Sequence, residues 1–280
     1  MAETITVMGA GGTMGSRICS NLRARSTYQI RCVEPDPAAR AQLEAQEFET
    51  VDRAAAIPGA DAVILSVPDH VIGSLCAELI PELDPDTLVC LLDPTAAYAE
   101  VVPTVDEVPI FITHPCHPPL FGDAPDTDWF GGQGEAAQSL VCALYHGTDA
   151  DYARGESLAR DVFAPVSATY RLTVEQLARL EPALVEHLLT TCLLAVQAGA
   201  DQLRAAGIPE DAITAMVLGH LRTQLAMFFG DLDHQLSAGA ERAVAQGRSQ
   251  VLAEDWDAVL APDRLKENAS EIATLHPASE

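Results

Sequence analysis

Two histidines and a cysteine lie within four positions of a proline-rich stretch, at His114, Cys116 and His117. Imidazole accepts and donates protons near neutral pH, and imidazole and thiolate groups both bind metal ions. The stretch therefore suits a catalytic acid and base, a metal site, or a loop stiffened by Pro115 and Pro118. The elements that carry these side chains decide between the three interpretations.

Strand-like and helix-like segments alternate before this stretch. We expect strands over residues 3–8, 28–36, 61–69, 87–95 and 108–115, with a helix in each of the first three intervals. Such alternation is typical of an α/β fold with a Rossmann-type doubly wound parallel sheet. Two more strands, over 137–147 and 164–173, enclose a helix over 151–163. The sequence thus predicts a dinucleotide-binding Rossmann domain over residues 1–172, with His114 at the carboxyl edge of its sheet.

The rest of the chain has helical spacing. Thr173 and Gln176 form a capping-box pattern, and Pro182 is expected to kink the long helix that follows rather than end it. A second helix is expected over residues 207–230. We predict an all-helical C-terminal domain over residues 173–280. Because its helices carry apolar residues on more than one face, we also expect a homodimer through this domain.

A glycine-rich turn joins the first strand to the first helix. In "VMGAGGTMG" the glycines permit a tight turn, close approach of a pyrophosphate to the backbone, and close packing of helix on strand. The cofactor-binding residues expected in this turn are Gly9, Gly12, Thr13, Met14 and Gly15.

Two further segments are expected to contact the cofactor. Glu34 closes the second strand, where a carboxylate accepts hydrogen bonds from the adenosine ribose and repels a 2′-phosphate, so NAD is favoured over NADP. Val67, Pro68 and Asp69 follow the third predicted strand at the carboxyl edge and would flank the cofactor. For Asp69 the alternative role is that of a helix cap.

Composition excludes several classes of partner. Sixteen basic against 41 acidic residues leave a net charge of −25, which repels nucleic acid. The longest uninterrupted apolar stretches are shorter than a bilayer requires, so we expect no membrane insertion. Seven cysteines in strand-like and helix-like segments, such as Cys32, Cys90 and Cys192, suit buried thiols in a reducing, cytoplasmic compartment.

The motifs "GAGGTMG", "SVPD" and "THPCHPPLFGD", followed by a helical C-terminal half, resemble the 6-phosphogluconate dehydrogenase-like oxidoreductases. With "TVEQLARLEPALVEHLL" and "LGHLRTQLAMFFGD", the whole chain is most similar to the D-apionate oxidoisomerase family. This resemblance implies a phosphogluconate-dehydrogenase-type C-terminal domain. It also implies NAD-dependent oxidation of a branched sugar acid coupled to isomerisation.

One residue departs from the wider group, whose members use a lysine on the interdomain helix as acid and base. The only lysine here is Lys266, near the C-terminus, and the equivalent stretch contains Glu181, Glu186 and His187 instead. Lysine chemistry is therefore excluded unless Lys266 folds back to the site.

The catalytic residues expected are His114, His117 and Glu186. Oxidation of a carbinol needs a base for the hydroxyl proton, so His114 is the expected acid/base and His117 a second acid/base or a substrate-orienting group. Alternatively, His114, His117 and Glu186 bind a metal ion that polarises a ketol oxygen. Arg171 and Arg222 are the candidates to hold a substrate carboxylate.

The sequence is also compatible with three other functions. The chain could be another 6-phosphogluconate dehydrogenase-like enzyme or a ketol-acid reductoisomerase-like enzyme. A non-catalytic, dinucleotide-binding regulatory protein would keep the same fold without turnover, because fold alone does not establish chemistry.

Overall fold

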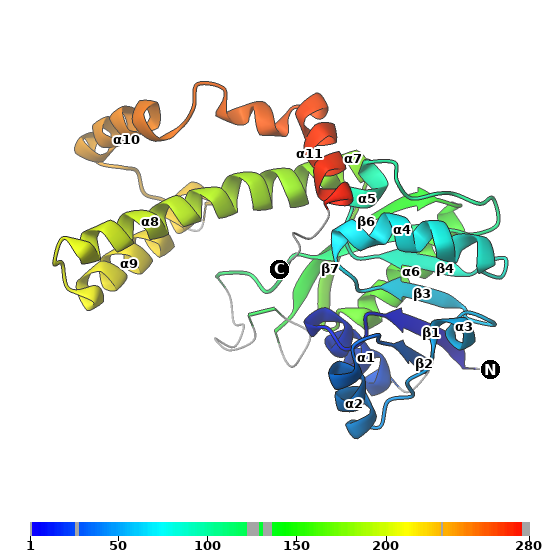
Figure 1. The fold of residues 1–280 in the computed structure, drawn as a ribbon. Coiled ribbons are helices and arrows are strands. Elements are labelled where there is room, and N and C mark those ends of the chain that lie inside the picture. Colours follow the sequence, from blue (N-terminus) through cyan, green and yellow to red (C-terminus); the bar gives the residue numbers. More distant parts are fainter. Residues whose placement is uncertain (1, 26–27, 122–128, 131–135, 231, 276–280) are drawn as a thin grey trace. The chain divides into compact units, whose positions relative to one another are not determined.

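The computed structural model describes residues 2–25, 28–121, 129–130, 136–230 and 232–275. The chain forms two compact units, Met1–Pro182 with Leu265–Glu280, and Ala183–Arg264. The first contains the whole sheet (Figure 1). The sequence predicts a domain boundary at residue 172, and that boundary stays a prediction. By contacts, the first turns of the long helix and the C-terminal helix belong with the sheet.

A seven-stranded sheet forms the centre of the first unit, in the order β2-β1-β3-β4-β5-β6-β7. The strands are β1 Glu3–Met8, β2 Tyr28–Val33, β3 Ala62–Leu65, β4 Leu88–Leu91, β5 Ile110–Pro115, β6 Gln138–His146 and β7 Val166–Leu172. Strands β1 to β5 pair in parallel, β6 pairs antiparallel with β5, and β7 pairs in parallel with β6. The predicted Rossmann-type fold is confirmed, and the prediction of a fully parallel sheet is corrected at β6.

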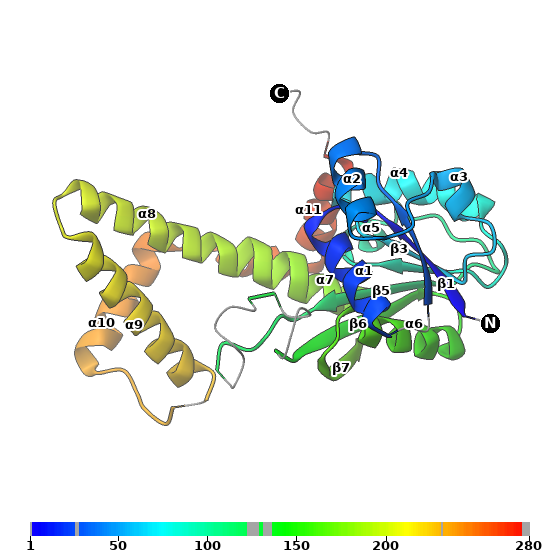
Figure 2. The same ribbon diagram turned by 90° about the horizontal axis from the view of Figure 1, so that it is seen from below.

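Helices cover both faces of this sheet (Figures 1 and 2). The helices of the first unit are α1 Thr13–Arg25, α2 Pro37–Ala45, α3 Arg53–Ala56, α4 Asp69–Leu79, α5 Thr95–Tyr98, α6 Asp149–Val162, α7 Val174–Ala178 and most of α11 Pro262–Thr274. One buried apolar cluster joins the sheet to α1, α2 and α6, and a second joins it to α4, α5 and α7. The central strands β3 and β4 are buried along their whole length, as expected for strands with helices on both sides.

The long helix changes its winding after α7. Residues Arg179–Thr190 form a π-helix that contains Pro182, and α8 Thr191–Ala205 continues it. Proline has no N–H for the usual helical hydrogen bond, so the predicted disturbance at Pro182 is a stretch of wider turns. Within this stretch Glu181 is buried, whereas Leu180 is 39% exposed.

The second unit begins within the π-helix and contains α8, α9 Glu210–Phe228 and α10 Ala238–Val251, with a short 3-10 helix at Trp256–Leu260. Helices α8 and α9 lie side by side in both views. Helix α8 buries no residue, and Leu194 and Met216 are 57% and 62% exposed. By length and composition alone, the helical run Val174–Ala205, which contains a window of 18 residues with a mean hydropathy of 1.4, could cross a membrane. The prediction of no membrane insertion is based on uninterrupted apolar stretches, which are shorter than this run. It stays a prediction.

All seven cysteines are free thiols. Five are buried, including Cys32 and Cys90, which agrees with the prediction for those two residues. Cys116 and Cys192 are exposed, so the prediction of a buried Cys192 is wrong. It lies on α8, and no residue of that helix is buried.

Candidate active site

The glycine turn has the conformation that the motif predicts. Gly9 has φ +72°, which a side chain rarely adopts, and a Cβ there would lie 2.2 Å from the carbonyl oxygen of Ser66. A Cβ on Gly15 would lie 2.2 Å from the carbonyl oxygen of Gly9, so this glycine permits close packing of α1 on β1. A Cβ on Gly12 would meet only ordinary contact, at 3.5 Å. Contacts with the described part of the protein therefore do not require glycine at position 12.

Helix α1 begins at Thr13, so the amides of Thr13 and Met14 lie in its first turn and have no carbonyl partner one turn earlier. The Gly12 amide is less open than expected, because it donates to the Gly9 carbonyl oxygen at 3.3 Å. Such an N-terminal turn attracts anions. Phosphate binding by Thr13 and Met14 stays a prediction.

Glu34 lies against the glycine turn. It follows β2, and its Oε2 accepts the backbone N–H of Gly11 at 2.8 Å, while Oε1 accepts that of Asp36 at 3.0 Å. Val67 approaches the same turn from β3, because its Cγ1 would lie 3.1 Å from a Cβ on Gly9. Pro68 is the N-cap of α4, without a side-chain hydrogen bond, and Asp69 is the first residue of that helix. The predicted segments thus meet at the carboxyl edge of the sheet.

His114 lies on β5 at the same edge. Its Nδ1 donates to the carbonyl oxygen of Leu92 at 2.9 Å, which leaves the lone pair of the neutral ring on Nε2. Burial lowers the pKa of His114, an effect that the Leu92 hydrogen bond and the charge of Asp93 oppose. The ring is therefore neutral at pH 7.

His117 follows β5 in a strained backbone conformation, with φ +59°. Its Nδ1 donates to the carbonyl oxygen of Phe130 at 3.1 Å, and its ring centroid lies 6.5 Å from that of His114. Cys116 lies between the two histidines, is exposed, and donates its backbone N–H to Ser139. The structure brings the two predicted histidines together at one end of β5.

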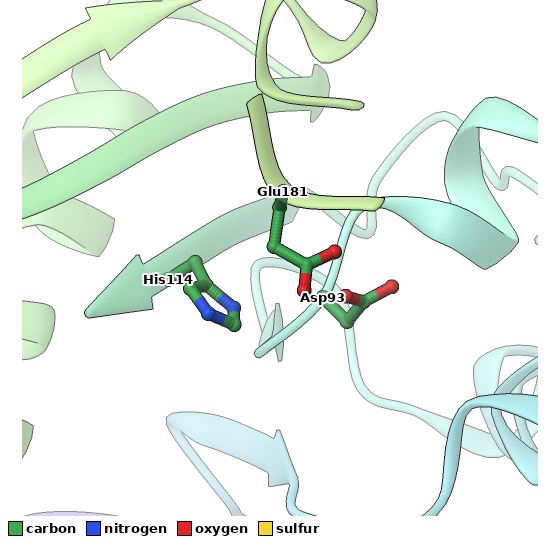
Figure 3. A group of neighbouring side chains, drawn as sticks. All are labelled: Asp93, His114 and Glu181. Carbon is green, nitrogen blue, oxygen red and sulfur yellow. The ribbon is translucent and has the colours of Figure 1, made fainter. Parts of the chain in front are cut away.

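Two carboxylates that the sequence did not single out as catalytic lie beside His114. A ring nitrogen of His114 and one oxygen each of Asp93 and Glu181 all lie within 4.8 Å of one another (Figure 3). Asp93 and Glu181 are 8% and 9% exposed. This group is the candidate metal centre among the residues that the structure describes.

The signals for these two residues were present but ambiguous. Asp93 directly follows β4, the neighbour of β5, and the carboxyl ends of adjacent parallel strands lie together. Glu181 precedes the predicted Glu186 by five residues on the same helix, and the π-turns alter which side chains share a face. Glu186 is exposed and belongs to the second unit, so its catalytic role stays a prediction.

Two basic residues are engaged elsewhere in the first unit. Lys266 does fold back, but its Nζ donates to the carbonyl oxygen of Tyr98 at 2.7 Å and pairs with Glu100 at 2.8 Å. Arg171 pairs with Asp149 at 2.6 Å, and its guanidinium stacks on the ring of Tyr152.

This sheet edge and the helical part define a class of proteins, the dinucleotide-binding oxidoreductases. Residues 121–273 match the family model "Phosphogluconate dehydrogenase (decarboxylating) C-term", and residues 4–94 match "NADP oxidoreductase coenzyme F420-dependent". D-apionate oxidoisomerase of Rhizobium rhizogenes is 38% identical over 266 residues, which cover 93% of this chain and 96% of the relative. The enzyme of the same name from Cupriavidus necator is 35% identical over 97% of this chain and 100% of the relative. The chain belongs to the D-apionate oxidoisomerase family.

Solved structures agree with this assignment. A semialdehyde dehydrogenase NAD-binding protein from Cupriavidus necator, in complex with calcium and NAD, superimposes with a TM-score of 0.91 at 35% identity, covering 97% of this chain and 100% of that protein. An NADH-preferring ketol-acid reductoisomerase from an uncultured archaeon has a TM-score of 0.67 at 16% identity, with coverage of 97% and 82%, and shares the fold.

Proposed function

We propose that this protein is an NAD-dependent oxidoreductase that oxidises a hydroxylated sugar acid and couples the oxidation to isomerisation, with D-apionate as its substrate. The observation that carries the proposal is the convergence of the glycine turn, Glu34 and His114 at one sheet edge. The names of the relatives support the substrate class.

NAD is the proposed dinucleotide because Glu34 stands against the glycine turn, 2.8 Å from the Gly11 amide. A carboxylate there accepts hydrogen bonds from ribose hydroxyls and repels the extra phosphate of NADP. The Cupriavidus structure was solved with NAD. The family model that matches residues 4–94 is named for NADP, and Glu34 argues against that cofactor in this chain.

The oxidation divides the hydrogen of a CH–OH group into two parts. The carbon loses a hydride to the nicotinamide ring, the hydroxyl proton passes to an imidazole, and the products are a ketone, NADH and a proton. His114 and His117 are the proposed imidazoles. Each is oriented by a hydrogen bond from Nδ1 to a carbonyl oxygen, which leaves Nε2 as the acceptor in the neutral ring.

We further infer a cytoplasmic homodimer that associates through the helical unit. Helices α8 and α9 expose large apolar side chains, and an apolar groove between them is lined by Leu193, Val196, Ile213, Val217 and Leu221. Such a surface is buried by a second copy in many oligomers. The free buried thiols suit a reducing compartment.

The test of the function is NADH absorbance with purified protein, NAD and a panel of polyhydroxy acids that includes D-apionate. We expect NADH to form with D-apionate faster than with straight-chain sugar acids, and no comparable rate with NADP. Absence of NADH formation with every acid, in protein that binds NAD, would favour the non-catalytic regulatory interpretation.

A further inference from the structure

We propose that Asp93, His114 and Glu181 bind one divalent cation. Ligand atoms bonded to a single cation at about 2.0–2.4 Å can lie at most about 4–5 Å apart. The three side chains meet this condition, since the chosen ligand atoms lie within 4.8 Å of one another. Figure 3 shows them facing a common point from three separate segments.

A divalent cation would also balance the charge of the two carboxylates at this site. Asp93 and Glu181 are both more than nine-tenths buried, and two carboxylates in a site of low polarity repel one another. A divalent cation offsets both negative charges, and the neutral imidazole of His114 adds a ligand without adding charge.

The surroundings hold two of these ligands in place. Asp93 Oδ1 accepts the backbone N–H of Thr95 at 2.7 Å, and the His114 ring is fixed by its 2.9 Å hydrogen bond to Leu92. Hydrogen bonds of this kind orient the carboxylates and imidazoles of metal centres. The donor set contains two carboxylate oxygens, one imidazole nitrogen and no thiolate, which suits Mn²⁺ better than thiophilic ions.

The role of the cation rests on the proposed function, whereas its binding does not. The protein carries a net charge of −25, and Arg171, one of the two arginines predicted to hold a substrate carboxylate, is already paired with Asp149, so a bound cation would add positive charge for an anionic sugar acid. A cation at the carboxyl edge of β4 and β5 would bind oxygens of the hydroxy acid and polarise the ketone that oxidation produces. With His114 as a ligand, His117 is left as the proton acceptor.

The experiment is a Mn²⁺ titration of the full-length protein, freed of metal with EDTA and without NAD or substrate. Free Mn²⁺ is followed by electron paramagnetic resonance. We expect one site per chain with a dissociation constant of about 1–100 µM. Asp93→Asn and Glu181→Gln should each weaken binding by at least about tenfold.

Glu175→Gln is the matched control, because it removes the same charge from the exposed face of α7, where Glu175 pairs with Arg179. This variant should bind Mn²⁺ like the parent. Mn²⁺ should also raise the melting temperature of the parent and of Glu175→Gln, but not that of Glu181→Gln.

Two results would overturn the proposal: no Mn²⁺ binding by the parent up to about 1 mM, or unchanged affinity in folded Glu181→Gln and Asp93→Asn. NAD affinity, measured separately by fluorescence, reports on the proposed function. A failure of the cation site is therefore distinct from a failure of the oxidoreductase assignment.

Discussion

At the scale of single residues, the chemistry concentrates on His114. The imidazole is held by Leu92, kept neutral by burial, and flanked by Asp93, Glu181 and His117. Asp93, Glu181 and His117, the ionisable side chains around this ring, come from separate segments of the sequence. Their convergence is what distinguishes this histidine from one that merely caps a strand.

Replacing His114 should abolish most turnover while sparing cofactor binding. We expect His114→Asn to lower kcat by about 10²- to 10⁴-fold, because it removes from the reacting centre the imidazole that is proposed to bind the cation, or to accept the proton where no cation is bound. The affinity for NAD should change little, since the glycine turn and Glu34 lie on other strands. His117→Ala should also lower kcat, because His117 is the proposed proton acceptor when His114 binds the cation, and a fluorescence measurement of NAD affinity beside steady-state kinetics separates effects on turnover from effects on cofactor binding.

Glu34 should determine the choice of cofactor. Glu34→Arg removes the charge that repels a 2′-phosphate and supplies one that attracts it, so NADP should gain and NAD should lose affinity. The ratio of kcat/KM for the two cofactors measures the change. Equal use of NAD and NADP by the unaltered protein would show that the assignment of Glu34 is wrong.

Cys116 should take no part in the reaction. Partial burial raises the pKa of its thiol, so the reactive thiolate fraction at a given pH is smaller than for an ordinary cysteine. We expect Cys116→Ser to keep parental turnover and alkylation of Cys116 at pH 7 to be slow, increasing as the pH rises. Peptide mass spectrometry identifies the labelled residue, and rapid labelling at pH 7 would contradict this account.

At the scale of elements, two glycines of the turn between β1 and α1 are expected to have different roles: Gly15 is required by packing, and Gly12 by the cofactor. Gly15→Ala would place a Cβ 2.2 Å from the Gly9 carbonyl oxygen, so we expect a loss of about 1–3 kcal/mol in the free energy of unfolding, or more. Gly12→Ala meets only a 3.5 Å contact and should fold normally, yet weaken NAD binding. Thermal melts and NAD titrations test the pair, and equal NAD affinity in Gly12→Ala and the parent would argue against a pyrophosphate at this turn.

The sequence predicted these elements well where the pattern is local. Alternating apolar residues and the turn glycines identified β1, α1 and β2, and the capping box identified the start of α7. The direction of β6 is not a local property, because it depends on how the chain returns after β5. Glu181 was missed for a related reason: a regular helical period does not apply across π-turns that contain Pro182.

At the scale of the whole molecule, helices α8 and α9 expose several large apolar side chains. We expect the full-length protein to be a dimer by light scattering at micromolar concentration and moderate salt, without detergent. Replacing two exposed groove residues, as in Leu193→Glu with Leu218→Glu, should produce monomers because each introduces a charge into the contact. A clean monomer mass for the parent would contradict the dimer. Co-sedimentation of the parent with lipid vesicles would instead favour a membrane role for the helical run Val174–Ala205.

Single-turnover formation of NADH tests the role of His114 most directly: the protein, loaded with one equivalent of NAD, is mixed with excess D-apionate. We expect about one NADH per chain in the parent, and at least about a hundredfold slower formation in His114→Asn at equal NAD occupancy. NADH formation at the parental rate in His114→Asn would contradict the assignment of His114 to the reacting centre. Failure of the NAD-loaded parent to form NADH would contradict D-apionate oxidation itself.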